Sequence, residues 1–403
     1  MANASLVAAS RGELDPIEIN RLQDNLSNIQ EQSVKRTGIA DSPLHGGKAP
    51  RWLFQRMRML ARQLIIAIVY EFGAQELLHR VSDPHWFQAF GSVLGFDWHS
   101  SGLTTTVCGA IKEGIKGLEQ DLGFYVAGGK GKAGLKTPEH ILGFGESLSI
   151  DPKALVYASK MSAKVDNAGL QDGYTLYHHA FFFTSKGHWA VVQQGMNETS
   201  RYARRYHWLG ETVCEFTREP HAAICASRRE QDVLNMVAQE SEEARKASAL
   251  VGRQTPDALV NELKKVQTLK LPRRHAILAE DLHPDRLYKT LVKTYEAQPD
   301  DFENLIGLQG VGPKTIRALA LLSELIYGAN VSFRDPARFS FAHGGKDGHP
   351  YPVDRTSYDR SIEILKQAVE KARIGDGKKM EVIKRLERIE SSNISSPPWG
   401  SLF

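Results

Sequence analysis

Residues 304–322 hold the densest group of side chains and backbone groups suited to binding chemistry in this chain. A glycine turn at residues 310–312 is followed by Pro313, which can open a helix because its missing N–H costs nothing there. Glycines let the backbone approach a ligand closely, and the first N–H groups of a helix have no partner within it. This pattern predicts an anion site, with candidate contacts at Gly310, Val311, Gly312, Lys314, Thr315 and Arg317.

Three lysine-glycine loops point to the same kind of ligand. The tetrapeptide His-Gly-Gly-Lys occurs at residues 45–48 and again at 343–346, and a third loop at 128–132 carries Lys130 and Lys132. Exposed glycine amides and a lysine charge suit phosphate, and a DNA backbone contact positions a protein without reading sequence. None of the loops has the Walker spacing, which excludes a P-loop nucleotide triphosphatase.

A basic aromatic segment at residues 199–209 is a further candidate for DNA contact. We expect a helix here, with Arg201, Arg204 and Arg205 pairing with phosphates while the interleaved aromatic rings stack on bases. The alternative is a surface helix whose aromatic side chains lie in the core.

Two clusters of acidic and histidine residues suit a divalent metal. Asp97 and His99 alternate in the string 95–102, so both would face one ion if that piece is extended. The alternative is a helix cap with a buried histidine. In the second cluster, Asp172 and His178 share parity along an expected strand, whereas the adjacent His179 faces the other side.

These clusters predict metal-assisted hydrolysis of a phosphodiester, with Mn²⁺ or Mg²⁺ as the cofactor. The ion would offset charge on the phosphate and activate water, and a histidine would act as general base. The candidate metal ligands are Asp97, His99, Asp172 and His178. The candidate catalytic residues are Asp97, His99, Asp172, His178 and His179.

Composition sets the class of protein in which these sites must be built. The chain has 403 residues, 41% hydrophobic content and a net charge of +4. These values fit a globular protein, and the mildly basic charge permits binding to nucleic acid. Its three cysteines lack the spacing of a metal site and indicate reduced thiols. The sequence shows neither a signal peptide nor an apolar run long enough to span a membrane, so we expect a cytoplasmic protein.

The periodicity of apolar residues predicts the elements that position these sites. A long helix is expected from residue 50 to about 73, a β-hairpin at 173–184 and 188–194, and helices through the C-terminal half. The expected fold class is an α+β N-terminal domain followed by an all-α helix-hairpin-helix domain. The expected divisions are a flexible extension at 1–42, a catalytic domain at 43–228, a DNA-binding domain at 229–390 and a flexible tail at 391–403.

The string from the glycine turn to residues 352–354 resembles the hairpin-plus-aspartate motif of the helix-hairpin-helix DNA glycosylases. In bifunctional members the matching lysine forms a Schiff base with the sugar, so the resemblance implies Lys314 as nucleophile and Asp354 as its assistant. The sequence departs from that pattern in two ways. The gap before the aspartate is enlarged, and the arginine that normally follows closely is matched only loosely by Arg355 or Arg360.

Two further resemblances cover other parts of the chain. The strand at 189–194, Gly195 and the arginine-rich segment are similar to ParB-type nucleotide and nuclease domains. From residue 43 onward, the strings 44–54, 95–102 and 201–208 resemble an uncharacterised bacterial and archaeal family known only as a domain of unknown function.

The preferred hypothesis is a metal-dependent nuclease that binds DNA through the glycine turn and acts in DNA repair or maintenance. The alternatives are a glycosylase or abasic-site lyase that uses Lys314 and Asp354, and a DNA-binding scaffold without enzymatic activity. A single turn holds one duplex weakly, so a homodimer is compatible with the sequence.

Overall fold

The structure is a computed structural model, and it describes residues 51–95, 102–226, 229–231, 233–270, 282–337 and 355–371. All of them belong to the unit that spans residues 38–403. The helices in the first half are α3 (Arg51–Phe72), α4 (Ala74–Ser82), α5 (Pro84–Val93), α6 (Gly102–Ile115), α7 (Glu119–Leu122), α8 (Lys132–Leu135), α9 (Thr137–Gly143) and α10 (Pro152–Lys164). Those in the second half are α11 (Glu242–Gly252), α12 (Pro256–Val266), α14 (Pro284–Ala297), α15 (Phe302–Gly307), α16 (Pro313–Tyr327) and α17 (Arg355–Lys371). No described helix is long and apolar enough to cross a lipid bilayer.

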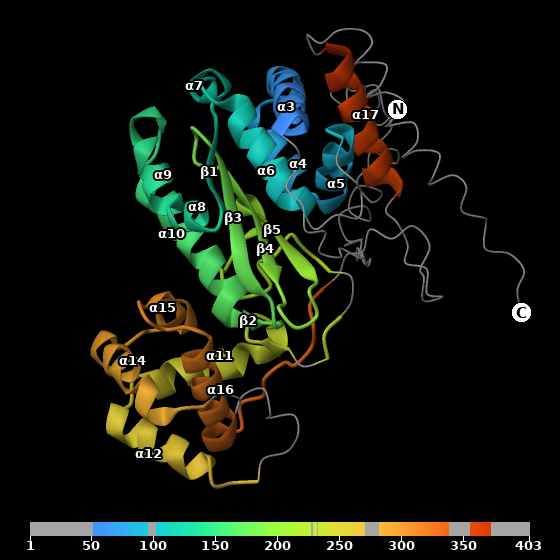
Figure 1. Ribbon diagram of the computed structural model, residues 1–403. Helices are drawn as coiled ribbons and strands as arrows, with labels where there is room; N and C mark the ends of the chain where they lie inside the picture. Colours follow the sequence, from blue (N-terminus) through green and yellow to red (C-terminus); the bar gives the residue numbers. More distant parts are fainter. Residues whose placement is uncertain are drawn as a thin grey trace, which may run out of the picture. The chain divides into compact units, whose positions relative to one another are not determined.

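An antiparallel sheet of five strands lies at the centre of the mixed α/β fold (Figure 1). Its strand order is β1-β3-β4-β5-β6. A separate pair joins β2 to β7. The strands are β1 (Phe124–Lys130), β2 (Leu170–Gln171), β3 (Thr175–Thr184), β4 (Trp189–Met196), β5 (Ala203–Leu209), β6 (Ala223–Cys225) and β7 (Leu234–Asn235).

The expected β-hairpin is confirmed, because β3 and β4 pair antiparallel on either side of a short turn. The helix expected over residues 199–209 is wrong, since most of that segment is strand β5, paired with β4 along its whole length. Both faces of β5 are buried, so arginines and aromatic rings occupy both sides and the polar-apolar alternation of a strand is missing. The C-terminal half was expected to be helical, but strand β7 precedes its first α-helix, which begins at Glu242.

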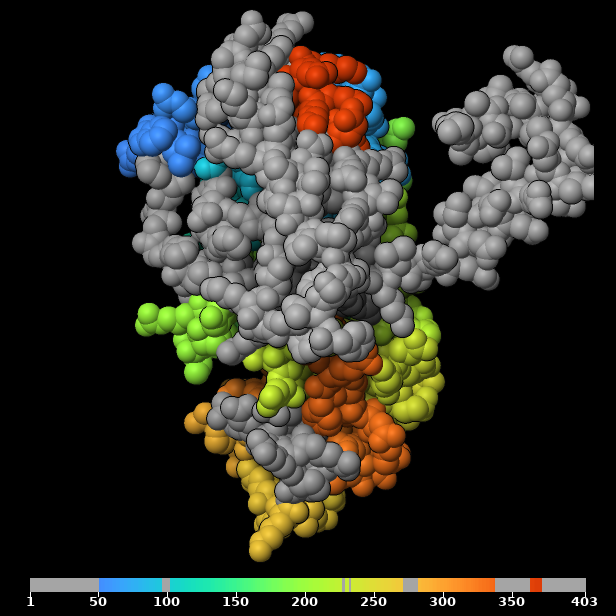
Figure 2. Space-filling view, turned by 90° about the vertical axis from the view of Figure 1, so that its right-hand side faces the viewer, coloured from blue at the N-terminus to red at the C-terminus, as the bar shows by residue number. Residues whose placement is uncertain are grey.

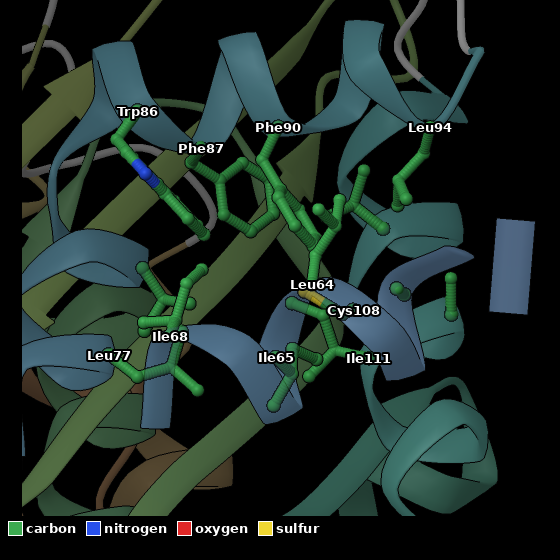
Figure 3. Close-up of a cluster of buried hydrophobic side chains, with 14 of the residues drawn as sticks. Leu64, Ile65, Ile68, Leu77, Trp86, Phe87, Phe90, Leu94, Cys108 and Ile111 are labelled. Atoms are coloured by element: carbon green, nitrogen blue, oxygen red, sulfur yellow. The ribbon is translucent and has the colours of Figure 1, made fainter. Parts of the chain in front are cut away.

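Helices cover both faces of the sheet. Ala180, Phe182 and Val192 pack against α3 to α6 on one face, in a cluster centred on aromatic residues of α5 (Figure 3). On the opposite face, Phe181 and Trp208 share a cluster with apolar residues of α9 and α10. Alternate side chains of each strand therefore enter different cores.

Helices α11, α12, α14, α15 and α16 form a third cluster of buried side chains. In the space-filling view these yellow to orange helices occupy the lower part of the picture (Figure 2). Helix α17 follows them in sequence but packs on α3 and α5, where Leu365 and Val369 join the first cluster. The C-terminal helices therefore contribute to two different cores.

Helix starts follow local sequence. Asp83 and Asp151 each precede a proline, and each accepts hydrogen bonds from main-chain N–H groups of the helix that follows. Asp301 caps α15 in the same way, through the N–H of Asn304. A proline at the first helical position and an acidic cap together fix where a helix begins.

We predict that Leu365→Ala lowers the free energy of unfolding by about 2–5 kcal/mol, because the side chain is fully buried between α17 and its neighbours. Urea unfolding monitored by fluorescence measures the change. Leu325→Ala is the control, since that side chain is 39% exposed and should cost much less. Equal stability of Leu365→Ala and the parent chain would show that α17 is not part of the cooperative fold.

Candidate functional site

The glycine turn predicted from the sequence joins α15 to α16. Gly310 has φ of 95°, a left-handed conformation that favours glycine, and Gly312 caps α16 just before Pro313. The side chain of Val311 is buried in the cluster of C-terminal helices and holds the turn against them. The expected order of helix, glycine turn and helix is confirmed in these local terms.

The outer side of this turn is open. Gly310 and Lys314 are exposed, and a methyl group added at Gly312 would meet no atom within 4 Å. Helix α14 runs beside the turn, with Lys293 Nζ 3.8 Å from the position of a Cβ at Gly310. The side chain of Thr315 is buried, so at this position only the main chain can reach a ligand.

The inner side of the turn is hydrogen-bonded to residues of α10 and β2. Lys164 Nζ, at the end of α10, donates to the carbonyl oxygens of Leu308 (3.1 Å) and Val311 (2.5 Å). Gln171 Nε2, in β2, donates to the carbonyl oxygen of Pro313 at 3.0 Å. Burial lowers the pKa of Lys164. Its side chain is thus partly withdrawn from water to hold main-chain carbonyls of the turn.

A π-helical turn, η2 (Val165–Gly169), lies between these two anchors and carries the buried Asp166. One carboxylate oxygen accepts from Gln193 Nε2 (2.5 Å) and Trp208 Nε1 (3.0 Å), and the other bonds His221 Nε2 (2.5 Å). Single π-helical turns occur often at functional sites. Asp166 therefore links η2 to β4, β5 and the segment before β6.

A chain of hydrogen bonds continues from Asp166 to α10. Gln193 Oε1 lies 2.8 Å from His179 Nδ1, and His179 Nε2 lies 2.9 Å from Ser159 Oγ. Because a carboxylate only accepts, Gln193 turns its NH₂ to Asp166 and its oxygen to His179. His179 then carries its proton on Nδ1 and accepts from Ser159. Burial lowers the pKa of His179, which favours this neutral form.

A second buried network surrounds Asp172. Its carboxylate accepts from Arg204 at 2.8 Å and from the hydroxyl of Tyr206 at 2.7 Å, and Arg204 also pairs with Asp335 at 2.7 Å. Burial disfavours the charged guanidinium, but the two carboxylates raise the pKa of Arg204 above its usual value. Arg204 is fully buried and paired, so its expected role as a direct DNA contact is wrong.

The structure separates Asp172 from His178, which the sequence placed on one face. A β-bulge between Leu176 and His178 shifts the register of β3 against β4. Asp172 bonds Arg204 on the α10 side, whereas His178 lies beside Gln194 and Arg205, which face α5 and α6. The expected shared parity is wrong, and the two residues do not converge on one ion.

His178, Arg205 and Lys130 belong to one row of cross-strand neighbours. The row runs from Lys130 in β1 through His178 and Gln194 to Arg205. Arg205 lies over the ring of Phe87 and is nearly buried, so it too is withdrawn from a surface contact with DNA. Lys130 is exposed at the edge of the sheet.

Some predicted residues are exposed and some lie outside the described part of the chain. Lys132 and Arg201 are exposed, as expected for contacts to a polyanion. No group of three or more potential metal ligands is present among the described residues. The predicted positions outside the described residues are Asp97, His99, Asp354 and the loops 45–48 and 343–346.

Sequence reasoning missed the residues that hold the turn and the polar network. Lys164 and Asp166 lie at an ordinary-looking helix end, Gln171 lies in the short strand β2, and Gln193 and His221 are far away in sequence. Their partners are long-range, so no local spacing identifies them. The one local clue is that Lys164 and Asp166 stand close together among apolar residues just before β2.

Comparison with protein-family models gives a match to the family described as "Protein of unknown function (DUF763)", over residues 38–353. The chain belongs to the DUF763 family. The resemblance expected from residue 43 onward is thereby confirmed, and the turn, η2 and both buried networks lie inside the matched region. No curated protein and no solved structure matches the chain. The description of the DUF763 family assigns no activity, so function must be argued from the site.

We predict that His178→Leu reduces the loss of stability on acidification. Burial, followed by the charges of His179 and Lys130, lowers the pKa of His178 to about 3, whereas an unfolded histidine titrates near ~6.5. Below pH ~6.5 the unfolded state binds a proton that the folded state does not bind. The free energy of unfolding therefore falls by about 1.4 kcal/mol per pH unit. The variant should therefore lose about 2 kcal/mol less than the parent between pH 7 and pH 5.

Urea unfolding at both pH values measures this difference. His283→Leu is the control, because it removes a histidine whose side chain is exposed to solvent. If the free energy of unfolding falls by the same amount in His178→Leu and in the parent chain, the assignment of His178 as a neutral buried imidazole is contradicted.

Proposed function

We propose that the protein binds DNA through the glycine turn between α15 and α16, by contacts to the phosphate backbone. The observation that carries the proposal is the two-sided character of the turn. On its inner side, Lys164 and Gln171 donate hydrogen bonds to its main-chain carbonyl oxygens. Its outer side, around Gly310 and Gly312, is open. A ligand approaching that side meets the amide end of α16, which favours an anion.

Side chains beside the turn support a polyanionic partner. Lys293 of α14 lies next to Gly310, and Lys314 is exposed at the start of α16. Lysine charges placed on both sides of exposed main-chain amides suit successive phosphates of one strand. Such contacts do not read base sequence, so we expect binding that tolerates sequence and weakens with salt. A homodimer would offer two such turns to one duplex.

The decisive variant is Gly312→Ala. The backbone at Gly312 has a negative φ and the added methyl group meets no protein atom, so the fold has no steric reason to require glycine there. If a phosphate approaches this position, the methyl group displaces it, and we predict binding to a short duplex about tenfold weaker, or ~1.4 kcal/mol. Fluorescence anisotropy at low salt measures the dissociation constant.

Gly143→Ala is the matched control, because an added methyl group there also meets no atom and the backbone is also unstrained. Thermal unfolding of both variants confirms that each remains folded. Equal affinity of the two variants, or no binding of the parent chain to duplex or single strands, would refute the proposal.

Cleavage of DNA is a second candidate function, favoured by one observation. The segment that fastens the turn also carries Asp166, whose carboxylate orients His221, and a carboxylate–histidine pair is the usual form of a general base. This assigns the acid-base role to residues other than the expected Asp172 and His178. The lyase alternative has less support. Lys314 is exposed, whereas nucleophilic lysines are activated by desolvation or a neighbouring cation.

We predict that the protein nicks supercoiled plasmid in Mn²⁺ or Mg²⁺, and that His221→Ala lowers the rate at least a hundredfold because the general base is lost. Gel electrophoresis with an EDTA control measures nicking, and His283→Ala is the control variant. Intact plasmid with the parent chain under every metal would rule out the nuclease. Borohydride trapping on an abasic duplex, lost in Lys314→Ala, would instead identify a lyase.

A further inference from the structure

A small pocket opens beside η2, between β6 and β7. Its walls include His221, Glu219 and Asn235, together with the apolar side chains of Ile224, Val237 and Pro336. The amide of Asn235 is already used, since its oxygen accepts from Val237 N and its nitrogen donates to the carbonyl oxygen of Arg334. The polar side chains left to meet a ligand are His221 and Glu219.

The orientation of His221 is fixed by its surroundings. Nε2 lies 2.5 Å from Asp166 Oδ1, and the ring packs edge-on against Trp208 with centroids 4.7 Å apart. A carboxylate accepts, so the neutral imidazole carries its proton on Nε2 and keeps a lone pair on Nδ1. Among the described residues, no group forms a hydrogen bond to Nδ1. The second carboxylate oxygen of Asp166 is held by Gln193 and Trp208, which prevents Asp166 from turning away.

Glu219 is held at the same pocket by a strained backbone. Its φ is 44°, a left-handed value that is uncommon for a residue other than glycine and costs on the order of 1 kcal/mol or more. The N–H of Glu219 donates to the carbonyl oxygen of Val237 at 2.8 Å, and Pro220 stiffens the link to His221. Strain of this kind persists where the surrounding structure imposes it, often at a ligand site.

We propose that this pocket binds a divalent transition-metal ion through His221 Nδ1 and the carboxylate of Glu219, with water completing the coordination. Imidazole and carboxylate together suit Mn²⁺, Co²⁺ and Zn²⁺. A metal-bound histidine almost always donates its other N–H to a carboxylate, and Asp166 occupies that position. Asp166 is a positioning residue in this site. The inference stands apart from DNA binding, because it concerns only the pocket. It is an alternative to the general-base role of His221, since the Nδ1 lone pair cannot hold a metal ion and accept a proton at the same time.

Titration of the full chain with MnCl₂, after removal of metal with EDTA and without DNA, tests the site. The electron paramagnetic resonance signal of free Mn²⁺ reports binding. We expect one specific site in the parent chain, no such site in His221→Ala, and affinity reduced about 10- to 100-fold in Asp166→Asn. Glu219→Gln should also weaken binding, and this exposed position tolerates the change without loss of the fold.

His283→Ala is the control, as an exposed histidine away from the pocket, and should bind Mn²⁺ like the parent chain. Circular dichroism confirms that each variant is folded, and Glu219→Gln carries the test if Asp166→Asn unfolds. Binding that is absent in the parent chain, or unchanged in both His221→Ala and Glu219→Gln, would overturn the inference. Neither result bears on the comparison of duplex affinity between Gly312→Ala and Gly143→Ala. Failure of the metal site is therefore distinguishable from failure of DNA binding.

Discussion

The carboxylate of Asp166 is the constraint on which the candidate site depends. A charge in the interior is tolerated only when hydrogen bonds replace the water it has lost, and Asp166 receives them from Gln193, Trp208 and His221. These donors come from three different segments. The carboxylate therefore fixes η2 against the sheet, and η2 fixes the position of Lys164 and Gln171, which hold the glycine turn.

The sheet divides the buried polar groups into two sets. Asp166 and Asp172, with Arg204, lie on the side of α10, while His178 and Arg205 lie on the side of α5 and α6. The β-bulge in β3 places His178 in the second set, because it reverses the side on which the residues after it emerge, whereas Arg204 and Arg205 lie on opposite sides because they are consecutive in β5. Chemistry that needs residues from both sets would have to act through the sheet. The side nearest the glycine turn is therefore the better candidate for function.

Buried arginines show why composition alone misleads about nucleic-acid contacts. In sequence, Arg201, Arg204 and Arg205 form a basic aromatic segment, yet only Arg201 is exposed. Arg204 instead joins β5 to Asp335 in the segment after α16, across more than a hundred residues of sequence. A guanidinium with several donors is well suited to such bridging, because it can satisfy two carboxylates at once.

By itself, the sequence determined the elements whose causes are local. Helix α3, the β3–β4 hairpin and the glycine turn followed from apolar periodicity, turn residues and a proline after glycine. Tertiary structure decided the strand state of β5, the faces of Asp172 and His178, and the meeting of Asp166 with His221. Those outcomes depend on pairing between distant segments and on the need to satisfy buried charges, and neither leaves a periodic trace in the chain.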